Sequence, residues 1–225
     1  MIAPVFKNRT MSSLIGILSL FLTLTATSDA LSCIKCISQS STCSGSRVTC
    51  RSGNVCGSEY AEAIVGGMRT EALMRSCVPS SQCNAKGTIS TSELQIRMAM
   101  SCCSTDDCTP NISELSSKGT NLNGLVCPSC ISSDAASCYT SDTVQCTGDE
   151  NMCILQTSKL SGSMSSLAAI RGCATKSVCD LGRKTETISG ISMDVSTFCT
   201  SGSKSVHKVV LNPAVVCLLL LKLFF

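Results

Sequence analysis

The sequence predicts an all-β, disulfide-rich protein built from two tandem domains, and three observations support this fold class. Nineteen of the 225 residues are cysteine. The cysteines occur in two blocks with nearly the same spacing, and the segments between them read as short strands separated by glycine turns. Domains of about 75 to 80 residues bury little apolar surface, and disulfides typically contribute about 2 to 4 kcal/mol each. We therefore expect the bridges to replace much of the core.

The two cysteine blocks indicate a duplication. Seven consecutive spacings agree to within one residue, and the blocks are offset by 94 residues, which is typical of a repeated unit. The first block contains Cys33, Cys36, Cys43, Cys50, Cys56, Cys77, Cys83, Cys102, Cys103 and Cys108. The second contains Cys127, Cys130, Cys138, Cys146, Cys153, Cys173, Cys179 and Cys199.

The long gaps between cysteines are predicted to form β-hairpins, because apolar and polar residues alternate on both sides of Gly- or Ser-rich turns. In the first domain, Gly66 and Gly67 supply the permissive backbone of a tight turn. The expected strand pairs are residues 60–65 with 70–75, 152–157 with 167–171, and 185–188 with 191–198.

Residues 1–30 have the features of a secretory signal peptide. Lys7 and Arg9 precede an apolar run over residues 14–24, and small residues precede a cleavage site after Ala30. The alternative is a retained signal anchor, which needs roughly 20 apolar residues.

Residues 201–225 have the features of a glycosylphosphatidylinositol (GPI) anchor signal. Ser201, the expected attachment residue, is followed by Gly202, Ser203, a short polar spacer and an apolar tail over residues 209–225. The alternative is a single membrane span. Cys217 lies in this tail, so processing leaves an even number of cysteines, which should pair in the secretory route.

Charge and residue types argue against several functions. Residues 31–201 contain 13 Lys and Arg against 14 Asp and Glu, which does not favour nucleic-acid binding. The only histidine, His207, lies in the spacer before the tail, so we expect no enzyme, and no cofactor or metal. The carboxylate pairs Asp106/Asp107 and Asp149/Glu150 are interpreted as exposed turn residues.

The two CxxC pairs, Cys33/Cys36 and Cys127/Cys130, are compatible with zinc knuckles or redox-active dithiols. Structural disulfides are the favoured interpretation, because the chain carries a secretory signal and each CxxC has downstream cysteines to pair with. Spacing alone does not choose the connectivity, since eight cysteines allow 105 arrangements.

The order of a CxxC pair, three single cysteines, a gap of about 20 residues, segments such as SCVPSSQC, and a closing CCSTDDC resembles the Ly-6/uPAR family of three-finger domains. The resemblance implies three-finger domains at residues 31–110 and 126–200, joined by a linker at 111–125. In the first domain it implies the pairs Cys33–Cys56, Cys36–Cys43, Cys50–Cys77, Cys83–Cys102 and Cys103–Cys108. In the second it implies Cys127–Cys153, Cys130–Cys138, Cys146–Cys173 and Cys179–Cys199.

The chain departs from the family pattern in two places. Thr109 stands where an asparagine usually follows the last cysteine, and the second domain lacks the ninth and tenth cysteines. Ten cysteines followed by eight resemble the gamma-type inhibitors of secreted phospholipase A2. Those inhibitors are generally soluble, whereas this chain has an apparent anchor signal.

The hairpin over residues 60–74 is the expected partner-binding surface, since loops on a rigid scaffold commonly carry recognition. Its candidate contact residues are Tyr60, Ile64, Val65, Met68, Leu73 and Met74. The alternative is that alternate residues only face the sheet. The hairpin over residues 155–167 is Ser/Gly-rich and a weaker candidate. Asn111 begins an Asn-Ile-Ser glycosylation sequon.

Together these features predict a non-enzymatic, extracellular protein-binding module. We expect a cell-surface receptor or adhesion protein attached to the plasma membrane by a GPI anchor, with an extracellular protein as its ligand. The alternative is a secreted inhibitor of phospholipase A2.

Overall fold

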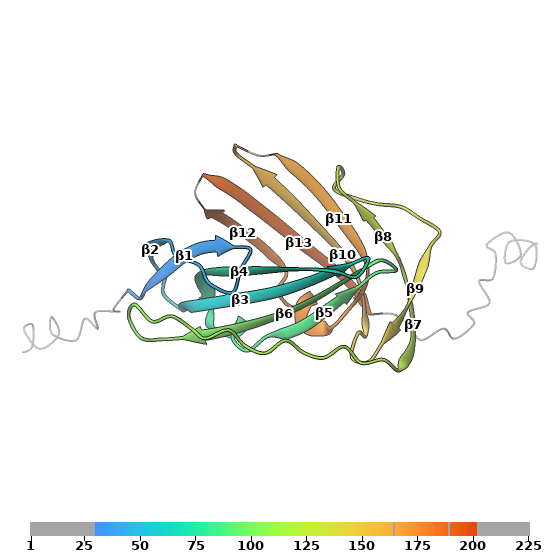
Figure 1. The fold of residues 1–225 in the computed structure, drawn as a ribbon, viewed down its shortest axis with the longest axis horizontal. Coiled ribbons are helices and arrows are strands. Elements are labelled where there is room, and N and C mark those ends of the chain that lie inside the picture. Colours follow the sequence, from blue (N-terminus) through green and yellow to red (C-terminus); the bar gives the residue numbers. More distant parts are fainter. Residues whose placement is uncertain (1–29, 164, 189, 202–225) are drawn as a thin grey trace, which may run out of the picture. The chain divides into compact units, whose positions relative to one another are not determined.

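The computed structural model describes residues 30–163, 165–188 and 190–201. These residues form thirteen strands, of which eleven join one sheet and two form a second sheet (Figure 1). Most of the predicted signal peptide lies outside the described residues. So do the predicted spacer and tail, with His207 and Cys217.

The first domain consists of three β-hairpins, or fingers, paired side by side (Figure 1). A 3-10 turn, Ser80–Gln82, separates the second finger from the third. The fingers are β1 (Ser32–Ser38) with β2 (Ser46–Thr49), β3 (Asn54–Val65) with β4 (Met68–Pro79), and β5 (Lys86–Ser90) with β6 (Leu94–Cys103).

The second domain also has three fingers in chain order. Its elements are β7 (Leu122–Pro128), β8 (Cys130–Ser132) and β9 (Thr143–Thr147) in the first finger, β10 (Met152–Ser161) with β11 (Ser166–Ala174), and β12 (Arg183–Ile188) with β13 (Ile191–Ser201). Unlike in the first domain, β7 and β9 of its first finger form the separate two-stranded sheet, and β8 pairs with β11. A short helix, α2 (Lys176–Cys179), precedes β12. The prediction of an all-β protein with two three-finger domains is confirmed.

Strand β7 begins inside the segment 111–125 that was expected to be linker. Leu122 pairs with Thr147 of β9. The Asn123 side chain holds this start in place, because its amide donates hydrogen bonds to the carbonyls of Gly148 and Glu150, at 3.0 and 3.1 Å. The second domain therefore takes up four residues of the expected linker.

The turn of the β3–β4 hairpin is the one predicted from its two glycines. Val65 pairs with Met68, so Gly66 and Gly67 form a two-residue loop. Their φ angles are +56° and +84°, and a hairpin turn with two positive φ angles matches the twist of the flanking strands. Any side chain at either position would be strained.

Nine disulfides hold the fingers together, and they join the same pairs that the family resemblance implies. Those of the first domain are Cys33–Cys56, Cys36–Cys43, Cys50–Cys77, Cys83–Cys102 and Cys103–Cys108. Those of the second are Cys127–Cys153, Cys130–Cys138, Cys146–Cys173 and Cys179–Cys199.

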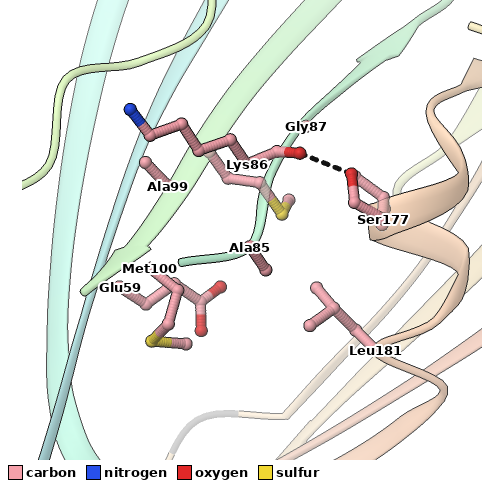
Figure 2. Close-up of a pocket in the computed structure, with 10 residues that line it drawn as sticks. Glu59, Ala85, Lys86, Gly87, Ala99, Met100, Ser177 and Leu181 are labelled. Carbon is pink, nitrogen blue, oxygen red and sulfur yellow. Dashed lines mark hydrogen bonds between the residues drawn. The ribbon is translucent and has the colours of Figure 1, made fainter. Parts of the chain in front are cut away.

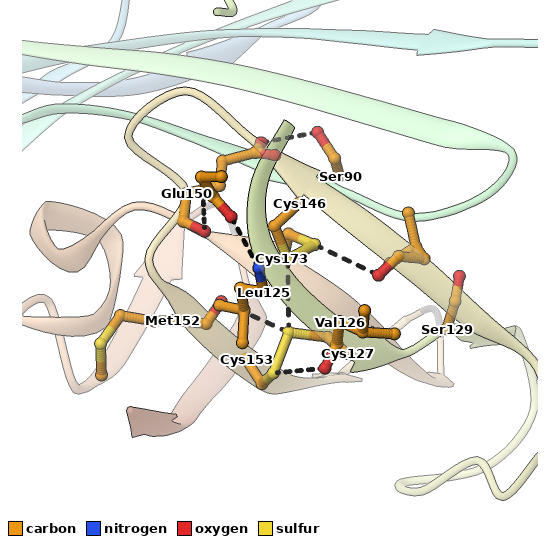
Figure 3. The surroundings of a disulfide bond; sticks show 12 residues. Ser90, Leu125, Val126, Cys127, Ser129, Cys146, Glu150, Met152, Cys153 and Cys173 are labelled. Atoms are coloured by element: carbon orange, nitrogen blue, oxygen red, sulfur yellow. Dashed lines mark hydrogen bonds between the residues drawn. A yellow bond between two sulfur atoms is a disulfide. The ribbon is translucent and has the colours of Figure 1, made fainter. Parts of the chain in front are cut away.

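Sulfur atoms occupy the centre of each domain. In the first, the Cys33 and Cys50 sulfurs lie 3.1 Å apart, so two disulfides pack against each other. In the second, the Cys127 and Cys146 sulfurs lie 3.4 Å apart beside buried Leu125 (Figure 3). The bridges thus fill space that aliphatic side chains occupy in larger cores.

One continuous sheet crosses from the first domain to the second through β5 and β11. Ile89 and Ser90 of β5 pair with Ala174 and Cys173 of β11. An apolar cluster covers this junction, and it contains Ile89, Ile154, Ala174 and Val178. This aliphatic cluster therefore lies between the domains, whereas the centre of each domain is rich in sulfur.

Two glycines allow this close approach. A β-carbon at Gly172 would lie 2.1 Å from the carbonyl oxygen of Ser90, and one at Gly87 would lie 2.4 Å from the hydroxyl oxygen of Thr175. Helix α2 sits over β5 at this point, where the Ser177 hydroxyl donates to the Lys86 carbonyl (Figure 2). The packing of the two domains thus depends on positions that lack a side chain.

Candidate functional site

The β3–β4 hairpin presents only part of the predicted contact surface. Met68 is 74% exposed and Val65 is 45% exposed, both at the tip, while Ile64 is partly buried. Leu73 and Met74 are buried, at 0% and 8% exposure, so they are not available to a partner. Leu73 pairs with Ser38 of β1. Because β1 of the first finger lies beside β4 here, this part of the hairpin is inside the sheet and not at its edge.

A charged network supports the tip from beneath. The Glu62 carboxylate is fully buried and forms ion pairs with Arg69 and Arg97. Burial raises the pKa of Tyr60, and a hydrogen bond to Glu71 raises it further. Tyr60 is therefore engaged within the hairpin. The apolar surface that remains available to a partner consists of Val65 and Met68 at the tip of the hairpin.

The carboxylate Glu150 is not an exposed turn residue, contrary to the interpretation from its sequence position. It is 1% exposed. It accepts hydrogen bonds from the hydroxyls of Thr88 at 2.8 Å and Ser90 at 2.6 Å, both on β5 of the first domain. Figure 3 shows the contact with Ser90. Asp149 beside it is exposed, as predicted. A buried carboxylate that receives two hydroxyl hydrogen bonds ties the domains together.

The other predicted carboxylate pair is exposed and has a structural role. Asp106 accepts a hydrogen bond from the backbone amide of Ser32 at 2.8 Å. Asp107 forms an ion pair with Arg47 at 3.1 Å. Both acids therefore hold the closing segment of the first domain against its first finger.

Ion pairs join the third finger of the second domain to the first domain. Lys184 on β12 contacts Glu59 on β3 at 2.8 Å. Glu186, also on β12, contacts Lys35 on β1 at 3.0 Å. These side chains are between 14% and 23% exposed, so solvent screens them less than it screens surface pairs.

The outer face of the second domain carries a group of side chains that the sequence reasoning did not single out. Phe198 is 63% exposed and Tyr139 is 83% exposed. The Arg171 guanidinium lies 5.3 Å from the centre of the Tyr139 ring, within the range of a cation–π contact. Phe198 and Arg171 are the cross-strand neighbours of Leu155, on either side of it. We call Tyr139, Leu155, Arg171 and Phe198 the aromatic face.

The amino-acid composition gave an indication of the aromatic face. Residues 31–201 hold only three aromatic side chains, Tyr60, Tyr139 and Phe198. In a protein so poor in aromatics, two exposed rings on one face call for an explanation. Sequence position hid the signal, because Tyr139 and Phe198 lie far apart in the chain. They share a face only because Tyr139 contacts Arg171 of β11, and β10 pairs with both β11 and β13.

Two further predicted sites lie at the surface. Asn111 is exposed, and its carbonyl accepts a hydrogen bond from the Ser101 hydroxyl. Ser201 is the exposed last residue of β13, where it pairs with Met152. Among the residues described, no helix is both long and apolar enough to cross a bilayer.

Comparisons with known proteins agree with this architecture. The profile of the u-PAR/Ly-6 domain matches residues 29–111 and 123–208. Phospholipase A2 inhibitor NAI from Notechis ater is 32% identical over 169 residues, covering 73% of this chain and 84% of that protein. The 25 kDa subunit of a phospholipase A2 inhibitor from Naja kaouthia is 28% identical over 158 residues, covering 68% of this chain and 85% of that protein.

A solved structure also matches, the crystal structure of mouse TEX101. The match covers 76% of this chain and 99% of that chain, at 18% sequence identity and a TM-score of 0.32.

Proposed function

Because the chain belongs to the u-PAR/Ly-6 domain family, we propose that it is a non-enzymatic, extracellular module that binds a protein through the tip of its β3–β4 hairpin. The observation that carries the proposal is the exposure of Met68 and Val65 on an arm whose base is fixed by disulfides and whose outer part is held by buried Glu62. A rigid arm loses little conformational entropy on binding.

The tip proposal is tested with the variant Val65→Ser/Met68→Ser. Binding of the protein to cells that carry its ligand should fall at least about tenfold, since these two side chains supply the apolar surface that the ligand would cover. Leu122→Ser is the matched control, because Leu122 is a comparably exposed aliphatic residue, at 63%, on β7. Equal binding by the tip variant and the wild type would contradict the proposal.

A second candidate function is inhibition of a secreted phospholipase A2. The curated relatives with this activity in their names match 73% and 68% of the chain at about 30% identity. The test measures hydrolysis of phospholipid vesicles by a secreted phospholipase A2 at increasing protein concentration. Inhibition in the nanomolar range would establish this function, and its absence at about 10 μM would eliminate it.

We also propose that the mature protein is attached to the outer surface of the plasma membrane by a GPI anchor at Ser201. Support comes from the small residues 201–203 followed by an apolar segment at 209–225. A phosphatidylinositol-specific phospholipase C should release the protein from intact cells. Retention after this treatment would favour the single membrane span instead.

Glycosylation at Asn111 is proposed on the basis of its exposure and its sequon. Asn111→Gln should increase electrophoretic mobility to that of the wild-type protein treated with a glycosidase. Equal mobility of the untreated proteins would show that the sequon is unused.

A further inference from the structure

The aromatic face forms a row of side chains across three strands of the second domain. In the register, Leu155 of β10 lies opposite Phe198 of β13 on one side and Arg171 of β11 on the other. Tyr139 continues the row, because its ring lies against the Arg171 guanidinium. Leu155, Arg171 and Phe198, with Pro128 and Thr200, border a shallow groove.

The same face is positively charged. Side chains alternate between the two faces of a sheet, so Lys159 lies on the face of Leu155, and Arg183 lies there through its pairing with Ser196. In the described part of strands β10 to β13, the acid on this face is Asp194, which is neutralised by its ion pair with Arg183. Asp134, in the loop that leads to Tyr139, also reaches this face, because it accepts a hydrogen bond from Ser132, whose partner on β11 is Ala169. Lys159 and Arg171 therefore leave a small excess of positive charge beside the exposed aromatic rings.

This face lies close to the part of the chain that leads to the apolar segment. Phe198 precedes Ser201 by three residues on the same strand. Residues 202–208 separate Ser201 from the apolar segment at 209–225. Seven residues span at most about 25 Å when fully extended, so a membrane attachment at either place holds this face near the bilayer.

We propose that the aromatic face rests on the lipid headgroups of the membrane that carries the protein. This inference rests on the membrane attachment proposed above. Aromatic side chains are stable at the headgroup level, and Arg and Lys form charge-assisted hydrogen bonds with lipid phosphates. The attachment near Ser201 supplies a high effective concentration, so weak contacts of the face with lipid suffice.

The absence of tryptophan from the chain gives a direct test. Phe198→Trp in the full chain, incorporated into phosphatidylcholine vesicles, places a single tryptophan on the aromatic face. Phosphatidylcholine brominated on its acyl chains should quench this fluorophore about twofold, since an interfacial ring contacts the upper acyl chains. Met68→Trp is the matched control, because Met68 is comparably exposed on the first domain, and its fluorescence should be quenched by aqueous iodide but not by bromolipid.

Flotation of the vesicles separates the two proposals. If the wild-type chain does not float with lipid, the attachment is wrong. If the chain floats and iodide quenches both tryptophans equally, the lipid-facing orientation is wrong. If the tryptophan at position 198 is shielded from iodide but not quenched by bromolipid, a protein covers the face, and the lipid proposal is again overturned.

A charge-reversal variant provides a second readout. Arg171→Glu in the Phe198→Trp background should reduce bromolipid quenching while flotation is unchanged, because a carboxylate repels lipid phosphate. Lys176→Glu on helix α2 is the control, since Lys176 is exposed but does not belong to this face. Equal quenching in both variants would contradict the role of Arg171. Tyr139→Trp replaces the reporter if the first variant folds poorly.

Discussion

The two domains share a scaffold but differ in what they expose. The first has a fifth bridge, Cys103–Cys108, buries a charged network beneath its central hairpin and exposes two aliphatic residues at the tip. The second has four bridges and a Ser/Gly-rich central tip, and it exposes both of its aromatic rings on one face of the sheet. The cysteines fix the fingers in both domains, while the side chains on the fingers are free to serve different contacts.

Removing equivalent disulfides should show whether they stabilise the two domains equally. Cys50–Cys77 and Cys146–Cys173 both close loops with a sequence separation of 27. Replacing either pair with alanine should cost about 3.5 kcal/mol of unfolding free energy, because the two loops restrict the unfolded chain equally. Denaturant titration of the two variants measures this loss.

The bridge that only the first domain possesses is the control for this experiment. Cys103–Cys108 closes a loop with a sequence separation of 5, so its removal should cost only about 2 kcal/mol. A loss as large as that at the long loops would show that strain or packing, rather than loop length, determines the contribution of these bridges.

The junction between the domains should depend strongly on Glu150. Glu150→Ala leaves the Thr88 and Ser90 hydroxyls without their acceptor, and the unfolding free energy should fall by about 2 to 3 kcal/mol. Asp149→Ala, at the exposed neighbouring position, should change it by less than about 0.5 kcal/mol. Thermal unfolding followed by circular dichroism would distinguish these outcomes, and equal values would contradict the role of Glu150.

The ion pair between Lys184 and Glu59 should contribute less. Lys184→Met should lower the unfolding free energy by about 1 kcal/mol at low salt, and the difference should shrink as salt screens the pair. Lys176→Met is a suitable control, because both side chains of its pair with Asp180 are exposed to solvent. A loss that does not change with salt would indicate packing of the lysine stem instead.

The smallest effect is expected from pH at the third finger of the second domain. A hydrogen bond from Arg183 lowers the pKa of Asp194 below its ordinary value. This pair therefore stabilises the folded protein above the unfolded pKa of about 3.9, and the contribution is lost as pH falls through the folded pKa. NMR titration of the Asp194 carboxyl should show its pKa rise in Arg183→Met. An unchanged pKa in this variant would show that Arg183 does not cause the lowered pKa of Asp194.

The fingers could be predicted from the sequence because their signals are local. The spacing of the cysteines repeats, and Gly66-Gly67 specifies a turn by its own conformational freedom. The registers of β3–β4 and β12–β13 follow from these short-range features.

The surfaces could not be predicted because they depend on which strands become neighbours. Leu73 is buried by β1, and Glu150 by β5 of the other domain. Tyr139, through its contact with Arg171, and Phe198 share a face only when β10 pairs with β11 and β13. An Asp-Glu pair in a turn has the same local sequence whether a second domain covers it or water does. The aromatic face and the junction were therefore beyond the reach of local patterns.

The pairing of β5 with β11 has a consequence for the repeat itself. If each domain stood alone, β5 would present unpaired amide and carbonyl groups, and so would the Cys173–Ala174 end of β11, which extends beyond its pairing with β8. Such open edges recruit strands from other molecules. In the two-domain chain, the pairing of β5 with β11 covers these groups in both domains. A copy of either repeat expressed by itself would carry an open edge at this point, so we expect it to self-associate.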